Sequence, residues 1–278
     1  MKKMPIILTF DVDVELIWRG RDPEGFRKPG TLGLSMYEIK SALPRVFRIL
    51  EGYGNLPASF FVPGLIAEEY PETVKEIDRR GFEIGNHGYT HIYPDRLGSK
   101  EVEKDEYIRA SDLIEKLTGK RPRGYRSPAW DFSDDTIDIM EEMGFVYSSN
   151  MMDNDRIEYL EVGDRKTDIV EIPIAWVLDD AAYWLYSGKT QGKCMQPITS
   201  VENYWIKTFD VLYDEYREEK KRGIDSDISF ILTCHPQIIG RPANSLVLRH
   251  LIEHIRQKED VEFMSISDAV EQFLKEQK

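Results

Sequence analysis

Short apolar runs alternate with segments of helical periodicity along most of the chain. Runs of strand length occur at residues 5–11, 58–62, 82–85, 124–126, 145–147, 169–172, 228–233 and 261–264. Apolar residues spaced by three or four positions predict amphipathic helices at residues 36–53, 71–77, 101–118, 133–144, 201–221, 243–257 and 267–275. Such alternation is typical of a parallel sheet covered by helices, so we expect an α/β barrel or a doubly wound sheet.

Two stretches interrupt this pattern. Residues 19–33 are rich in Gly, Pro and Arg and predict a long loop, which in a compact domain is usually functional or mobile. Residues 177–195 are aromatic-rich and irregular. Pro44 is expected to kink or split the helix at residues 36–53. Because the sequence has no internal repeat, low-complexity tract or linker, we interpret residues 1–278 as a single domain.

Composition excludes several classes of protein. Apolar residues make up 41% and charged residues 31% of the 278 residues, which is typical of a globular protein. The net charge of −13 disfavours general binding to nucleic acid or to anionic membranes. Two cysteines, Cys194 and Cys234, are too few for a disulfide framework, and no run of about 20 apolar residues predicts a membrane span. The apolar run at residues 4–10 meets Asp11 without a cleavage site, so we expect a buried strand and a cytoplasmic protein.

Reactive side chains follow four of the expected strands. Ligands of α/β folds bind at the carboxyl ends of strands, so residues placed there are candidates for a site. The four strand ends carry Asp11 and Asp13, His87 and His91, Arg126, and His235. Their shared placement is stronger evidence than any single motif.

His87 and His91 suggest a metal site. Their i, i+4 spacing would place both rings on one side of a helical turn, and Asp13 could supply a third ligand. Two histidines and one carboxylate suit one divalent transition metal ion, with zinc the expected metal. The spacing alone is equally compatible with two surface histidines in a polar loop, and Asp13 favours the metal.

A second histidine motif lies near the C-terminus. His250, Glu253 and His254 match the inverted zincin pattern H-x-x-E-H. Leu251 and Ile252 belong to the apolar stripe of the same segment, so an ordinary outer helix is the favoured interpretation.

The remaining strand-end residues suggest acid–base chemistry. Asp11 and Asp13 are two apart and face the same side of an extended strand, so one can bind metal while the other stays free as a general base. Asp11 could instead be a second ligand or a hydrogen-bond acceptor. Arg126 could orient Asp11 or lie on the surface, and His235 could protonate a leaving nitrogen or be a hydrogen-bonded core residue.

Aromatic side chains lie near these strand ends in the sequence. They could form an apolar pocket or a sugar-stacking platform, although packing between loops is the commoner role. The residues are Trp18, Trp130, Trp176, Tyr183 and Trp184.

Four motifs occur in the order of a known family. They are TFDVD at residues 9–13, HGYTH at 87–91, YRSPAW at 125–130 and LTCHP at 232–236. The chain resembles the NodB homology domain of the polysaccharide deacetylases, carbohydrate esterase family 4. Val12 separates two aspartates that are usually adjacent, and Ala129 and Trp130 depart from the usual R-x-P-Y. These variants resemble a subgroup of peptidoglycan-deacetylase-like proteins, cyclic imide hydrolases and the metal-independent allantoinase, with the first of these most similar.

The resemblance implies a distorted (β/α)7 barrel and a homo-oligomer, often a tetramer in this subgroup. It implies metal ligation by Asp13, His87 and His91. It also implies that Asp11 is the base, oriented by Arg126, that His235 is the acid, and that Asp179 or Asp180 tunes this machinery. We further predict that Trp130, Trp176 and Arg241 contact substrate.

These inferences predict a metal-dependent hydrolase of a non-peptide carbon–nitrogen bond. We expect a small amide or cyclic imide as substrate, because no export signal is apparent and the segments at residues 19–33 and 176–186 could close the groove that a polymer needs. Deacetylation of peptidoglycan or of an N-acetyl sugar is the alternative. A non-catalytic binding protein on the same fold is disfavoured, because a binder need not keep both Asp11 and His235.

Overall fold

A single curled sheet forms the centre of the protein. The computed structural model describes residues 2–19, 26–186 and 195–277. Nine strands in these residues join in one sheet, with the order β6-β7-β5-β4-β3-β2-β1-β8 and with β9 beside β1. The strands are β1 (Met4–Asp11), β2 (Ser59–Val62), β3 (Glu83–Asn86), β4 (Gly124–Tyr125), β5 (Tyr147–Ser148), β6 (Glu158–Val162), β7 (Arg165–Glu171), β8 (Phe230–Cys234) and β9 (Val261–Phe263).

The sheet is parallel apart from one hairpin. β6 pairs antiparallel with β7, and the other ladders are parallel. β6 and β8 are the first and last strands in the order of the sheet. An antiparallel bridge between Arg156 and Ile228 connects the segments that precede these two strands. This curled, mainly parallel sheet confirms the distorted barrel that the family resemblance implies.

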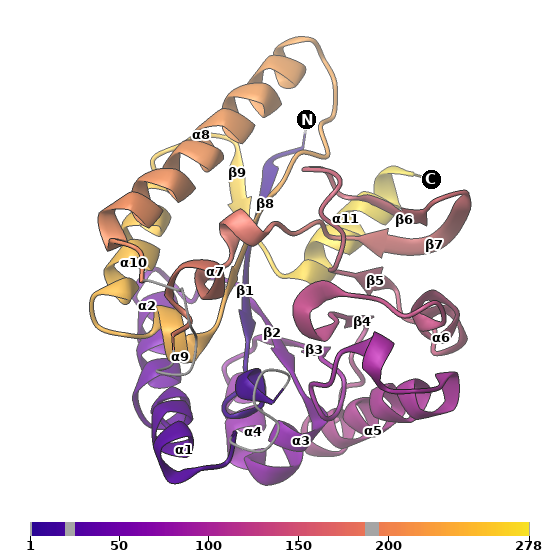
Figure 1. The fold of residues 1–278 in the computed structure, drawn as a ribbon. Coiled ribbons are helices and arrows are strands. Elements are labelled where there is room, and N and C mark those ends of the chain that lie inside the picture. Colours follow the sequence, from indigo (N-terminus) through magenta and orange to yellow (C-terminus); the bar gives the residue numbers. More distant parts are fainter. Residues whose placement is uncertain (1, 20–25, 187–194, 278) are drawn as a thin grey trace.

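Helices surround the sheet (Figure 1). The long helix α8 packs against α10 along one flank, and α5 packs against α3 and α4. Their bounds are α1 (Pro29–Ser35), α2 (Leu43–Gly52), α3 (Gly64–Glu69), α4 (Pro71–Arg79), α5 (Lys100–Thr118), α6 (Thr136–Glu142), α7 (Asp180–Trp184), α8 (Ile198–Lys221), α9 (Pro236–Ile239), α10 (Asn244–Ile255) and α11 (Ile266–Glu276). All eight residues of β1 are buried, as expected for a parallel strand covered on both faces.

Aromatic rings fill the interior beneath the carboxyl ends of the strands. A Cβ atom on Gly124 would lie 2.3 Å from the ring of Tyr147, and one on Gly85 would lie 2.5 Å from the ring of Phe61. Both positions therefore require glycine, because a side chain would displace a buried ring. The ring of Phe61 in turn supports the guanidinium of Arg126, 4.1 Å from its centroid.

Several element bounds differ from those that the sequence predicts. The predicted helix at residues 36–53 is split at Pro44, as expected, into a π-helical turn at Glu38–Ala42 and α2. The predicted loop at 19–33 is wrong at its end, because α1 begins at Pro29, and residues 20–25 lie outside the described residues.

Helix α3 was not predicted, and further differences lie in the second half of the chain. The strand expected at 145–147 lies at 147–148, as β5. Strand β6 was not predicted; it lies at the edge of the sheet and pairs with β7 through a turn at Gly163. The aromatic segment contains a 3-10 turn, Trp176–Leu178, and helix α7, while residues 187–194, including Cys194, are outside the described part.

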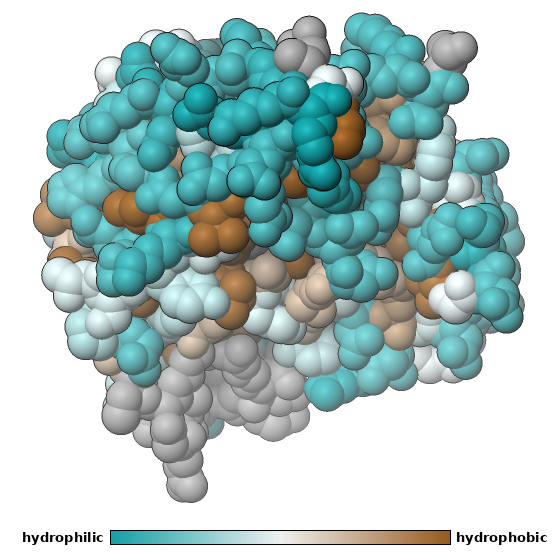
Figure 2. All heavy atoms as spheres, turned by 90° about the horizontal axis from the view of Figure 1, so that it is seen from above, coloured by the Kyte–Doolittle hydropathy of each residue, from teal (hydrophilic) through white to brown (hydrophobic). Residues whose placement is uncertain are grey.

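The surface is mostly hydrophilic (Figure 2), as the 31% of charged residues leads one to expect. Hydrophilic residues dominate the face in Figure 2, and the apolar residues form small groups among them. Within the described residues, none of the helices combines the length and the apolar character that crossing a membrane requires.

Candidate active site

Residues from two strand ends meet in a buried cluster. Asp13 follows β1, whereas His87 and His91 follow β3. One ligand atom of each side chain lies within 4.8 Å of the others, and all three residues are buried. The Nε2 atoms of His87 and His91 each lie 3.4 Å from a different carboxylate oxygen of Asp13. The structure therefore brings together the three residues predicted to bind metal.

The cluster fits a divalent cation. Neither carboxylate oxygen of Asp13 has a hydrogen-bond partner among the described residues, although both are buried. A buried carboxylate without donors is costly unless a cation faces it. His87 Nδ1 lies 2.7 Å from the backbone oxygen of Arg126, so Nδ1–H donates there and Nε2 keeps its lone pair toward Asp13.

The charge of Asp13 is stabilised by the rings around it. Burial alone would raise the pKa of Asp13, but His91, His87 and His235 lower it well below its ordinary value. Burial lowers the pKa of His87. The cluster thus combines an ionised carboxylate with a neutral imidazole, which are the protonation states that metal ligands require.

Asp11 is held apart from this cluster by Arg126. The Nη1 group of Arg126 donates to Asp11 Oδ1 at 2.8 Å and to the hydroxyl of Thr9 at 2.9 Å, and Nη2 donates to the hydroxyl of Ser149 at 2.8 Å. Arg126 is completely buried, so this is not the surface arginine of the alternative interpretation. The other oxygen of Asp11 lies 4.0 Å from His87 Nε2.

His235 lies against two aspartates. Its Nδ1 lies 2.8 Å from Asp180 Oδ1, and its backbone N–H donates to the same carboxylate. Asp179 Oδ1 lies 3.5 Å from Nδ1 and also accepts the backbone N–H of Ala181 at the start of α7. Burial opposes a charge on His235, but Asp179 and Asp180 raise its pKa well above the usual range. Its Nε2 is 3.7 Å from Asp13, so the ring faces the cluster.

The segment that carries the two histidines is a loop, and the expected helical turn is wrong. Gly88 and His91 have φ values of 67° and 59°, which no α-helix contains. Oε2 of Glu106, from α5, accepts the N–H groups of Tyr89 at 3.1 Å and Thr90 at 2.6 Å and the hydroxyl of Thr90 at 2.8 Å. Glu106 was not predicted from the sequence, where its only signal is a carboxylate beside buried Tyr107 on an amphipathic helix.

Two of the predicted substrate-contacting residues pack against each other with tilted rings. The rings of Trp130 and Trp176 have centroids 4.2 Å apart, and Trp176 remains 47% exposed. Ala129 and Trp130 both have positive φ, 58° and 60°, which is strained for residues with a side chain. The strained turn after Arg126 therefore directs Trp130 against Trp176.

The third predicted contact residue, Arg241, lies at a different cavity. Its guanidinium stacks on the ring of Tyr37 at 3.7 Å, and it lines a mainly apolar cavity of about 590 Å³ together with Trp18 and Trp184. Gln237, two residues after His235, also lines this cavity, and Trp184 ends α7, the helix that begins with Asp180.

The histidine motif in α10 does not form a metal cluster. His250 lies 3.1 Å from Glu202 and His254 lies 2.8 Å from Asp210 on the neighbouring helix α8, while Glu253 accepts the hydroxyl of Tyr53. The three side chains have separate partners, and the metal-binding groups found in the described residues do not include them. This supports the outer-helix interpretation.

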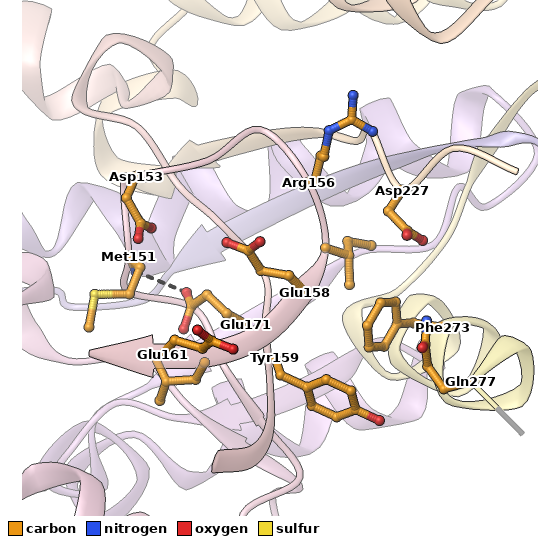
Figure 3. Close-up of a pocket in the computed structure, with 12 residues that line it drawn as sticks. Met151, Asp153, Arg156, Glu158, Tyr159, Glu161, Glu171, Asp227, Phe273 and Gln277 are labelled. Carbon is orange, nitrogen blue, oxygen red and sulfur yellow. Dashed lines mark hydrogen bonds between the residues drawn. The ribbon is translucent and has the colours of Figure 1, made fainter. Parts of the chain in front are cut away.

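A further cavity lies at the antiparallel end of the sheet. It has a volume of about 470 Å³ and contains none of the candidate catalytic residues (Figure 3). Glu171 lines it, and one carboxylate oxygen accepts the backbone N–H groups of Asn150 and Met151. Burial raises the pKa of Glu171 to about 7, although hydrogen bonds from Ser148, Asn150 and Met151 oppose the rise.

Glu171 makes stability depend on pH. The folded protein holds the proton up to about pH 7, whereas the unfolded chain loses it near 4.5, so the free energy of unfolding falls as pH rises between these values. Between pH 5 and pH 8, the free energy of unfolding of Glu171→Gln should therefore fall by about 2–3 kcal/mol less than that of the wild type. Urea unfolding at pH 5 and pH 8 measures it, with Glu161→Gln as an exposed control from the same cavity. Equal pH dependence of Glu171→Gln and the wild type would contradict it.

Comparisons with known proteins agree with the fold. The sequence profile of the family described as polysaccharide deacetylase matches residues 1–148. The chain is 30% identical to a peptidoglycan deacetylase of Helicobacter pylori, over 97% of each chain. A Mycobacterium smegmatis protein assigned to the polysaccharide deacetylases has a TM-score of 0.84 and 30% identity, covering 99% of this chain and 92% of that chain. An allantoinase has a TM-score of 0.77 at 20% identity, covering 96% and 89%, and shows the fold alone.

The barrel and these relatives define a hydrolase of carbon–nitrogen bonds other than peptide bonds. The chain belongs to the polysaccharide deacetylase family. The resemblance seen in the four sequence motifs is thereby confirmed.

Proposed function

We propose that residues 1–278 form one metal-dependent deacetylase domain that hydrolyses the N-acetyl amide of a glycan of the peptidoglycan type. The observation that carries this proposal is Asp13, a buried carboxylate faced by imidazole nitrogens and without a hydrogen-bond donor among the described residues. A protein that only binds glycan has no use for such a group beside Asp11 and His235.

Asp13, His87 and His91 would hold the ion. Two imidazoles and one carboxylate with further positions open are a donor set of catalytic zinc, so zinc is the proposed metal. When bound, such an ion polarises a carbonyl and lowers the pKa of water. The second coordination shell supports this assignment, because the Nδ1–H of His87 is held by the backbone oxygen of Arg126.

Asp11 and His235 would carry the protons. Asp11 accepts a proton from the attacking water while Arg126 holds its other oxygen in place. His235 then donates the proton on Nε2 to the leaving nitrogen, while Asp180 accepts a hydrogen bond from Nδ1–H and stabilises the imidazolium. The C–N bond breaks, a C–O bond forms, and acetate and a free amine leave.

The paired tryptophans favour a sugar substrate. Trp176 presents an exposed aromatic face whose position is fixed by Trp130 behind it. Such faces suit the apolar side of a sugar ring. The small amide or imide expected from the sequence depends on walls at residues 19–33 and 176–186, and residues 20–25 of the first wall lie outside the described part of the chain. The 30% identical relative is a peptidoglycan deacetylase, which also supports the glycan.

A direct comparison of substrates tests this function. Zinc-loaded protein is incubated separately with N-acetylglucosamine oligomers, peptidoglycan and a cyclic imide at equal concentrations of the scissile bond. Release of acetate is measured for the two glycans, and disappearance of the imide is measured for the third substrate. We expect acetate release from the oligomers to be fastest, with Asp11→Asn as the inactive control. Faster turnover of the imide than of any glycan would replace the glycan with the small substrate, and no turnover of any of them would favour a binding protein.

Trp176→Ala tests the stacking surface. We expect KM for the oligomers to rise about 3–10-fold with little change in kcat, because the lost contact is worth about 0.5–1.5 kcal/mol. The matched control is Tyr204→Ala on α8, which removes an aromatic side chain with the same 47% exposure. An unchanged KM in Trp176→Ala would show that the exposed ring does not contact the sugar.

A further inference from the structure

We propose that Glu38 and Gln237 form a clamp around the backbone of Val14, and that this Val14 clamp positions Asp13 for metal binding. The inference rests on the proposed metal site. It assigns a positioning role to two residues that lie outside the four sequence motifs and outside the candidate metal ligands.

Val14 has an unfavourable backbone conformation directly beside Asp13. Its φ is 49°, in the left-handed region that β-branched residues rarely adopt. The turn changes the direction of the chain immediately after Asp13, and Leu16 N–H then donates back to the Asp13 carbonyl at 2.8 Å. If Val14 relaxed to negative φ, the plane and direction of the preceding residue would change, so an external contact must hold it.

Side chains from two distant segments supply that contact. Oε2 of Glu38 accepts the N–H of Val14 at 3.1 Å. Gln237 Nε2 donates to the carbonyl of Val14 at 2.9 Å and to Glu38 Oε2 at 2.9 Å. Both polar groups of Val14 are therefore satisfied by the clamp, and the two clamp residues also bind each other in a closed ring.

The position of the clamp in the fold fits a role in the site. Glu38 and Gln237 are buried, and Glu38 Oε1 has no hydrogen-bond partner in the described part of the chain. A buried carboxylate retained with one oxygen unpaired indicates a requirement other than stability. Glu38 begins a π-helical turn, a feature frequent at functional sites. Gln237 lies two residues after His235, so the clamp links the loop of Asp13 to that of His235.

Zinc affinity tests the clamp without relying on turnover. Competition with a chromogenic chelator is measured for the purified full chain and its variants, and thermal unfolding checks that each is folded at the assay temperature. We expect Glu38→Ala to weaken zinc binding about 10–100-fold, as loss of a supporting contact does. Glu38→Gln, which keeps an acceptor oxygen for Val14 N–H, should bind zinc within about 3-fold of the wild type.

Glu103→Ala is the matched control. Glu103 is also a buried glutamate, with hydrogen bonds from Tyr107, Ser133 and Thr136, and it contacts none of the clamp residues. It should lower the unfolding temperature without changing zinc affinity. The clamp would be refuted if Glu38→Ala bound zinc like the wild type, or if Glu103→Ala lost as much zinc affinity as Glu38→Ala. Neither result would contradict the proposed metal site.

A second variant separates positioning from general damage. Glycine adopts positive φ freely, so in a Val14→Gly background the additional Glu38→Ala change should weaken zinc binding by a smaller factor than in the wild type. An equal or larger factor would contradict the clamp. Absence of zinc binding in the wild type would overturn the proposed metal site itself, and the clamp with it, which distinguishes the two failures.

Discussion

Asp11→Asn is expected to lower kcat for amide hydrolysis by about 10²–10⁴-fold, the range that a positioned general base contributes. Asparagine keeps the size of the side chain and an oxygen for Arg126, but its amide has no basic oxygen to accept a proton from water. Zinc affinity should stay close to that of the wild type, because Asp13 and not Asp11 faces both histidines. Acetate release and zinc competition on the same sample measure the two effects.

The control for Asp11→Asn is an aspartate in an ion pair far from the site. Asp138 pairs with Arg165 at 2.6 Å on the surface, so Asp138→Asn should retain full activity. Full activity of Asp11→Asn would show that another group accepts the proton. A loss of zinc from Asp11→Asn would instead make Asp11 a ligand, which is the alternative left open by the sequence.

His87→Ala is expected to reduce bound zinc from about one ion per chain to a small fraction, because only two protein ligands would remain of the three that catalytic zinc sites use. The variant also loses the hydrogen bond to the backbone oxygen of Arg126. Elemental analysis after dialysis measures the zinc content, and circular dichroism confirms that the variant is folded.

His250→Ala is the matched control, since it removes a histidine of the rejected motif in α10. Its ring lies 3.1 Å from Glu202 and half of it is exposed, so zinc content should not change. If His250→Ala lost the ion and His87→Ala kept it, the site would have to be moved to the outer helix.

The meeting of Asp11, His87, Arg126 and His235 could be predicted from the sequence because strand direction is a strong constraint. Each residue ends or follows a short apolar run, and parallel strands place their carboxyl ends at one edge. The order of the apolar runs along the chain was sufficient to predict that these residues meet. The two-residue error in the position of β5 did not affect that prediction. Neither the pairing of β6 with β7 nor the split helix at Pro44 alters this edge.

The supporting contacts could not be predicted in the same way. Glu106 and Glu38 lie on helical segments and reach loops 16 and 24 residues away, and a buried carboxylate looks the same in sequence as one on a solvated face. Local spacing also misled: H-x-x-x-H suits a helical turn, but contacts to Glu106 stabilise a loop with positive φ at His91. The sequence offered Asp179 and Asp180 as alternatives, whereas tertiary packing places both near His235 Nδ1, at 3.5 Å and 2.8 Å.

Arg126 contacts both His87 and Asp11 and so fixes the distance between them. Its carbonyl oxygen holds the ring of His87 and its guanidinium holds Asp11, so the separation of the proposed proton acceptor from the proposed metal ligand is set by the dimensions of one residue. The carbonyl contact survives any substitution, whereas the side-chain contact needs the planar fork of arginine. Substitution at this single position is therefore expected to impair the proposed proton transfer while the proposed metal site still binds its ion, so such a variant would lose turnover and keep its metal.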